Sequence, residues 1–569
     1  MNTMQEEHMR TLHTLPPNPF NASNPSSDCW VALHAARGLC VMDNPDFIAL
    51  SKAFWPQIFR WMSFFIRESL LKDHPHPLGP KGLEFRRKAV YATHGVLCRV
   101  VELHVAKAEE VKRTPELIPL VTKLALHLVK NQDPNFELIW SPLVKIIDNC
   151  DNITLFRRGL RDIVASDDPV EDVAIVTLRL LESEVQRTPV MDLYVLYGLM
   201  EMMMMCSRYN FHIHQRLLSA AVAERLPKVF TRYLPQSALY SSGDPPFIFR
   251  GVSSACLLLK HCFDDGFTWA CQALDEGLLP SLVALFMSDI SDHGTRTSEV
   301  VHLPVSMCLN TLKSLLVFRS VLNRVYRYVK IVPNEHMRKL SRAALRVHIP
   351  LLVLFEEARR MKNKMNSFDL DPVGLVCSNR TCSRGRRRQR AGKRIKWKRC
   401  DACRTVVYCS EYCQTQDWTN RHSVVCRHSR RSGNGESYRI SNLDEAFLRY
   451  LVSLEERKRE IGRQLRLMHS NSLKRSHPIV AQFDFRASPV QFKAVPYEEA
   501  LRDLQPLSHG RCTQGNTDCC VAENRLCCKQ SEEQLEEERR SWDSGMEILY
   551  QVVYVGLDCH SSFIFRKEK

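Results

Sequence analysis

Four close pairs of cysteine and histidine lie within 50 residues of this 569-residue chain and constrain its local fold more than any other feature. The eight candidate ligands are Cys377, Cys382, Cys400, Cys403, Cys409, Cys413, His422 and Cys426. Zinc takes four tetrahedral nitrogen or sulfur ligands, so eight ligands make two closed sites. A closed site has no open position for a reactive water, so we expect both ions to stabilise structure. A segment this short has too small a core to fold alone, and zinc would supply folding free energy.

The spacing of the last pair indicates a helix. Residues 410–424 read as a short helix that continues toward Cys426. His422 and Cys426 then lie one turn apart on the same helical face, where they can share one metal ion. Spacing alone leaves open whether the pairs bind zinc in sequential or interleaved order.

With these ligands the segment 377–426 resembles a MYND zinc finger. The match rests on the pairs Tyr408-Cys409, Cys413-Gln414 and Asp417-Trp418 and on the final His422-x3-Cys426. The segment differs from the family in two gaps, four residues after Cys377 where two is usual, and a basic stretch of 17 residues after Cys382. The resemblance implies interleaved pairs. One zinc would then bind Cys377, Cys382, Cys409 and Cys413, and the other would bind Cys400, Cys403, His422 and Cys426.

MYND fingers are protein-interaction modules, so the resemblance implies a protein partner. It further implies that a proline-containing peptide lies in a groove beside the second zinc, lined by Gln414 and Trp418. An extended proline-rich segment loses little entropy on binding and packs well on an aromatic ring. The alternative is that Trp418 is a core residue of the small fold. Some fungal MYND proteins with helical N-terminal regions are adaptors, and an adaptor is the function that we predict.

The region before the finger predicts a mainly α-helical fold. After a flexible N-terminal tail at 1–30, apolar residues recur at helical spacing through 31–365 and glycine is scarce. Five prolines, each directly after an apolar residue and two positions before another, suit the first position of a helix: Pro56, Pro119, Pro227, Pro280 and Pro350. This pattern resembles an irregular armadillo-like helical repeat, and an irregular all-α domain is the alternative.

The C-terminal extension, 441–569, reads as mixed. Residues 442–468 have a helical pattern, and alternating residues between Pro478 and Pro496 predict a short strand or hairpin. Residues 505–531 hold five cysteines and read as a loop, and 532–540 read as a charged helix.

Most of the net charge of +16 lies near the finger, because residues 371–440 hold 17 basic and five acidic residues. The insert 384–399 alone holds ten lysines and arginines. It reads as a solvated loop, a nuclear-import signal or, less well, a contact to nucleic acid phosphates. The second interpretation places the protein in the nucleus and/or cytoplasm. The third gives a rival function, a nuclear transcriptional cofactor that contacts nucleic acid.

No enzyme signature is present in the sequence, so we expect no catalytic residues. The enzymatic relatives of such fingers, the SET–MYND methyltransferases, carry an Asn-His-x-Cys-x-Pro-Asn segment that this chain lacks. An unrecognised methyltransferase is therefore the weakest alternative. No apolar run reaches the roughly 18 residues that a membrane-spanning helix needs.

Overall fold

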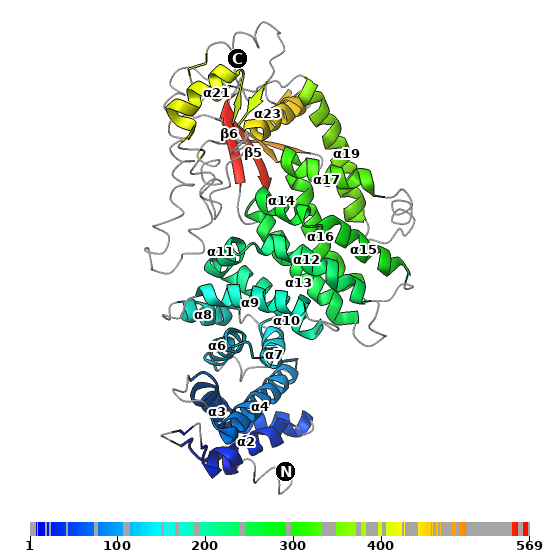
Figure 1. The fold of residues 1–569 in the computed structure, drawn as a ribbon. Helices are drawn as coiled ribbons and strands as arrows, with labels where there is room; N and C mark the ends of the chain where they lie inside the picture. Colours follow the sequence, from blue (N-terminus) through cyan, green and yellow to red (C-terminus); the bar gives the residue numbers. More distant parts are fainter. Residues whose placement is uncertain are drawn as a thin grey trace. The chain divides into compact units, whose positions relative to one another are not determined.

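A computed structural model gives the fold of this chain (Figure 1). Apart from isolated positions, it describes residues 10–17, 24–40, 44–72, 78–105, 114–148, 153–164, 170–186, 193–237, 245–291, 298–332, 349–370, 377–382, 397–400, 406–426, 442–456, 479–484, 490–496, 549–555 and 561–566. The chain divides into two compact units. The first unit is Met1–Val222 with Ser242–Leu258, and the second is Ala223–Ser241 with Leu259–Lys569.

Helices that lie near one another in sequence pack together in the first unit, for example α6 with α7 and with α8 (Figure 1). They are α2 (Ser27–Cys40), α3 (Asn44–Phe64), the π-helix η1 (Phe65–Leu70), α4 (Pro80–Val105), α6 (Leu117–Lys130), α7 (Phe136–Asp148), α8 (Ile153–Val164), α9 (Val170–Gln186), α10 (Leu193–Tyr209) and α11 (Phe211–Ser219). Their facing sides bury large side chains such as Trp61, Trp140 and Phe156. The expected mainly α-helical fold is therefore confirmed, while the armadillo-like repeat stays a prediction.

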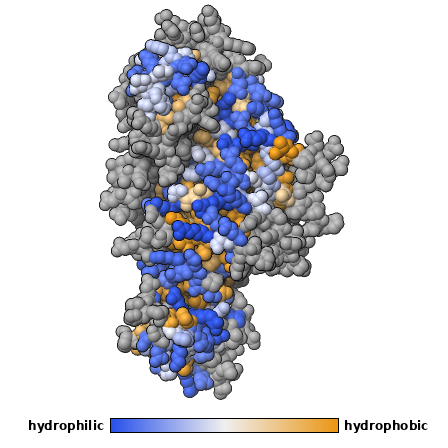
Figure 2. All heavy atoms as spheres, viewed as in Figure 1, coloured by the Kyte–Doolittle hydropathy of each residue, from blue (hydrophilic) through white to orange (hydrophobic). Residues whose placement is uncertain are grey.

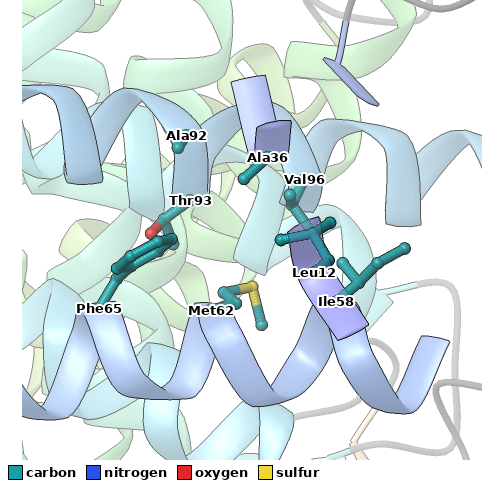
Figure 3. Close-up of a pocket in the computed structure, with 8 residues that line it drawn as sticks. All are labelled: Leu12, Ala36, Ile58, Met62, Phe65, Ala92, Thr93 and Val96. Atoms are coloured by element: carbon teal, nitrogen blue, oxygen red, sulfur yellow. The ribbon is translucent and has the colours of Figure 1, made fainter. Parts of the chain in front are cut away.

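The N-terminal residues are partly anchored in the first unit. Leu12 is buried, and the indole nitrogen of Trp61 donates a hydrogen bond to the Thr14 carbonyl at 3.1 Å. The prediction of a flexible tail over 1–30 was therefore wrong for this stretch, because it lends an apolar side chain to the core. A cavity of about 10 Å³ lies between Leu12, Thr93 and six apolar neighbours from α2, α3, η1 and α4 (Figure 3).

The second unit continues the helical packing. Its helices are α12 (Val222–Ser237), α14 (Phe267–Asp275), α15 (Leu278–Ser291), α16 (Ser298–Ser314), the 3-10 helix η2 (Leu315–Val317), α17 (Arg319–Ile331), α19 (Ile349–Leu370) and α23 (Asn442–Glu456). α13 (Pro245–Asp264) belongs to the first unit as far as Leu258 and to the second unit after it. α19 shows why these segments are helical, because its buried residues recur every three or four positions. They are Leu351, Leu354, Phe355, Ala358, Met361, Met365 and Phe368.

Three of the five prolines that were predicted to begin helices lie within the first three residues of a helix. Pro350 is the second residue of α19, and Pro119 and Pro280 are the third residues of their helices. Pro56, in contrast, lies inside α3, which begins at Asn44, and Pro227 is the sixth residue of α12. The prediction was wrong for these two. In α3 the buried stripe of Ile58, Trp61 and Met62 continues through the proline, and burial outweighs one lost backbone hydrogen bond.

The two ends of the finger segment converge on a single residue, Arg319, at the start of α17. The Arg319 guanidinium donates to Asp369 Oδ1 at 2.6 Å, and Asp369 is the penultimate residue of α19. The backbone N–H of Arg319 donates to Asp444 Oδ1 at 2.7 Å, and Asp444 is the third residue of α23. Residues 371–441, which hold the finger, are therefore an insertion between two helices that are joined at Arg319.

Apolar packing strengthens this junction. The Phe368 ring of α19 lies 5.5 Å from the rings of both Phe447 and Tyr450 of α23. Farther along, Glu455 is almost fully buried and forms ion pairs with Lys364 and Lys458. α23 is therefore part of the core of the second unit, although it follows the finger in sequence.

A four-stranded sheet of order β4-β3-β5-β6 completes the second unit. The strands are β3 (Ile479–Asp484), β4 (Gln491–Pro496), β5 (Leu549–Val555) and β6 (Ser561–Arg566). β3 and β4 form an antiparallel pair, which confirms the hairpin predicted before Pro496. β5 runs parallel to β3, a pairing that the local pattern did not reveal. The predicted loop at 505–531 and charged helix at 532–540 lie outside the described residues.

On the face shown in Figure 2, hydrophilic residues cover most of the described surface, and apolar residues show between them. Within the described part of the chain, no single helix has the length and apolar character to span a membrane. One sharply bent pair, Leu303–Val317 with Arg319–Ile331, meets those criteria jointly.

Candidate metal centre

A small hairpin and one helical segment form the finger. β1 (Lys398–Arg399) pairs antiparallel with β2 (Val407–Tyr408), and α21 (Glu411–Asp417) continues into the π-helix η3 (Trp418–His422). Ser410 begins the helix as its N-cap, because its hydroxyl accepts the backbone N–H of Cys413 at 3.3 Å. The helix predicted over 410–424 is present from Glu411 to His422 as these two consecutive pieces.

Four cysteines from three parts of the finger meet at the first candidate site. The sulfurs of Cys377, Cys382, Cys409 and Cys413 all lie within 4.8 Å of one another. Cys409 Sγ is 3.4 Å from Cys382 Sγ and 3.7 Å from Cys413 Sγ. Tetrahedral zinc with Zn–S bonds of about 2.3 Å places its sulfurs about 3.8 Å apart, whereas a disulfide needs about 2.05 Å. The spacing therefore fits a zinc ion, and all four residues are free thiols.

Hydrogen bonds of the two residues after Cys377 hold this segment in place. Ser378 donates its backbone N–H to the Val407 carbonyl at 2.9 Å and accepts the Val407 N–H on its hydroxyl at 3.1 Å. Asn379, which is buried, donates its side-chain amide to Gln416 Oε1 at 2.8 Å. Because these contacts join the first pair to β2 and to α21, the first site is supported from outside its ligands.

The electrostatics of this site favour a bound cation. Burial raises the pKa of the Cys377 thiol well above its ordinary value, and nearby Cys409 and Cys382 add to the effect. Burial, with the sulfurs of Cys382 and Cys413 beside it, raises the pKa of Cys409 to about 11. Four thiolates cannot share so small a space without a positive charge among them, and Zn²⁺ supplies that charge.

The second candidate site combines two cysteines and a histidine. Cys400, His422 and Cys426 place one ligand atom each within 4.8 Å of one another, and all three are buried. Cys400 Sγ lies 3.9 Å from Cys426 Sγ, again close to the tetrahedral separation. Cys403, the predicted fourth ligand, lies outside the described residues. The three ligands fit a second zinc ion, and they are the set that interleaving requires.

The structure also places the two residues predicted to face a peptide. Trp418 has 42% of its surface exposed, so it is not a core residue of the small fold. Its ring meets the His422 ring edge-on, with centroids 5.7 Å apart. Gln414 is half-buried and lies one helical turn before Trp418, on the same face. Most of the basic insert, residues 383–396, lies outside the described residues.

Reasoning from the sequence missed a polar contact at the centre of the finger. The Tyr408 hydroxyl donates to Asp417 Oδ2 at 2.8 Å, and both side chains are buried. Both residues belong to the motif that carried the family resemblance. Their separation of nine positions follows no helical or strand period, so the pattern gave no sign that they touch.

One set of four cysteines and a second set of two cysteines and one histidine, on a hairpin and a helix, define a small zinc-binding domain. Residues 379–426 match the family model described as the MYND finger. The chain therefore contains a MYND finger, a domain that binds zinc and mediates protein–protein interactions. No curated protein and no solved structure matches the chain.

Proposed function

We propose that this chain is a non-enzymatic adaptor whose finger binds a proline-containing peptide of a partner protein. The exposed indole of Trp418 carries the proposal. Exposing a large aromatic ring to water costs free energy, and a protein that keeps one rigid and exposed commonly uses it for binding. The His422 ring supports Trp418 from one side, so little side-chain entropy is left to lose on binding.

Proline-containing ligands suit this surface for two reasons. A proline ring is flat and apolar, so it packs against an indole, and the extended backbone around it is already ordered. Such a backbone keeps free carbonyl groups, and the Gln414 amide, one turn from Trp418, offers two N–H donors for them. The surface thus combines one apolar contact with one polar contact.

The helical part of the chain would hold a second partner. Joining two binding sites in one chain raises the effective concentration of one partner near the other. The insertion of the finger between α19 and α23 supports this arrangement, because both of its ends are fixed to the helical core at Arg319. We further propose that the protein acts in the nucleus and/or cytoplasm, with residues 384–399 as the import signal. Fusing that insert to a cytoplasmic fluorescent reporter tests this localisation.

The test is peptide capture by the purified, zinc-loaded full-length chain on an array of synthetic proline-containing peptides. Trp418→Ala should abolish capture while bound zinc stays at two ions per chain. Tyr412→Ala is the matched control, because Tyr412 is an aromatic residue of α21, 68% exposed, and lies off the helical face that Gln414 and Trp418 share. Capture that survives Trp418→Ala would contradict the proposal, and loss of zinc together with capture would make Trp418 structural.

A further inference from the structure

Tyr408 contacts residues of both candidate zinc sites and also Asp417, the residue directly before Trp418. It is fully buried, and it packs in one apolar cluster with Cys377 and Cys413 of the first site. Its ring also meets the ring of His422, a ligand of the second site, edge-on at 6.3 Å between centroids. Its hydroxyl donates to Asp417 at 2.8 Å. One side chain therefore contacts both metal-binding sets at once.

Asp417 connects this centre to the outside of the finger. It is the last residue of α21 and only 5% exposed, while Trp418, the first residue of η3, is 42% exposed. Neighbouring residues of a helix point about 100° apart, so the direction of Asp417 fixes that of Trp418. A buried carboxylate needs a hydrogen-bond donor to stay inside, and the Tyr408 hydroxyl is one. Losing this hydrogen bond would weaken the hold on the buried carboxylate, and the helical turn that carries both Asp417 and Trp418 would shift.

We propose that Tyr408 and Asp417 are the positioning pair that sets the orientation of Trp418, and that through them the peptide site depends on both zinc sites. This inference rests on the proposed function of Trp418 and adds how the site is regulated. Metal loss at the first site loosens Tyr408, and metal loss at the second site releases His422 from beneath the indole. Either event changes the direction of Trp418 and weakens peptide binding.

The test changes one hydrogen-bonding group at a time in the full-length chain. Tyr408→Phe deletes the hydroxyl but keeps the ring between the two sites. Asp417→Ala deletes the acceptor, whereas Asp417→Asn keeps an oxygen that can accept the same hydrogen bond. Tyr412→Phe is the matched control, because it makes the same chemical change at an exposed position of α21.

Three quantities are measured for each variant: zinc per chain, the Trp418 fluorescence and the affinity for a proline-containing peptide selected on the unaltered chain. The Trp418 signal is obtained by subtracting the spectrum of the same variant carrying Trp418→Phe. We expect Tyr408→Phe and Asp417→Ala to keep two zinc ions, to shift the Trp418 emission to the red and to weaken peptide binding roughly tenfold, as for one hydrogen bond to a charged acceptor. Asp417→Asn and Tyr412→Phe should stay close to the unaltered chain.

An unchanged Trp418 signal in Tyr408→Phe would overturn the inference, as would equal losses in Asp417→Asn and Asp417→Ala. Loss of zinc in Tyr408→Phe would also overturn it, because Tyr408 would then support the fold and not the indole. Should the unaltered chain capture no proline-containing peptide, the proposed function fails. The fluorescence comparison would still decide whether the pair positions Trp418.

Discussion

Asp444→Ala tests the junction that holds both ends of the finger. The Asp444 carboxylate is 4% exposed and accepts the first backbone N–H of α17 at 2.7 Å. Replacing a side chain that accepts such an N–H costs about 0.5–2 kcal/mol, and a carboxylate at a partly buried helix N-terminus adds up to about 2 kcal/mol. We expect the substitution to destabilise the junction by about 2 kcal/mol.

Local hydrogen exchange, followed by mass spectrometry, measures this loss where it occurs. A change of about 2 kcal/mol should speed amide exchange roughly 30-fold in the first turn of α17 and in α23. Asp369→Ala is the comparison, because it removes the other partner of Arg319, but its pair is 44% exposed on the aspartate side. Screening by water limits such a pair to about 1 kcal/mol at most. Equal effects of the two substitutions would refute the reasoning from burial.

Two further predictions concern the metal and the helical packing. Cys400→Ser should lower bound zinc from two ions to about one per chain by metal analysis. Cys98→Ser, which changes a cysteine of α4 outside the finger, should leave both ions bound. Two ions in both variants would exclude Cys400 as a ligand. Gly159→Ala should lower the unfolding temperature of the first unit, because the new Cβ would lie 2.9 Å from the Pro119 Cα, and overpacking of about 1–3 kcal/mol exceeds the helix-propensity gain of about 1 kcal/mol. A higher unfolding temperature would mean that α8 moves away from α6 without cost.

The ligands were predictable because zinc chemistry imposes short, ordered spacings on a sequence. The ligand atoms of His422 and Cys426 meet, as their spacing of four positions predicts. The partnership of Cys377 with Cys409, 32 positions later, depends on the hydrogen bonds between Ser378 and Val407 of β2, and spacing gives no information about it. The resemblance to a family supplied that pairing.

The fold was predictable to the extent that burial follows a period. The stripe along α19 identifies a helix, but nothing periodic links Arg319 to Asp444, which are 125 positions apart. At Pro56 the local sequence predicted the start of a helix, but the helix α3 continues through this proline. The burial of Trp61 and its neighbours outweighs the local preference of proline. Contacts that are both distant in sequence and made by single side chains are the ones that pattern analysis misses.

The finger and the helical units draw their stability from different sources. The buried cluster of the finger consists of Cys377, Tyr408 and Cys413, so two of its three members are zinc ligands. The helical units instead bury aliphatic and aromatic side chains, such as Trp61 and Phe263, that need no metal. A chelator should therefore unfold the finger and leave most of the helical signal in circular dichroism. An adaptor gains from this separation, because one recognition site can be lost or restored with metal while the helical scaffold stays folded.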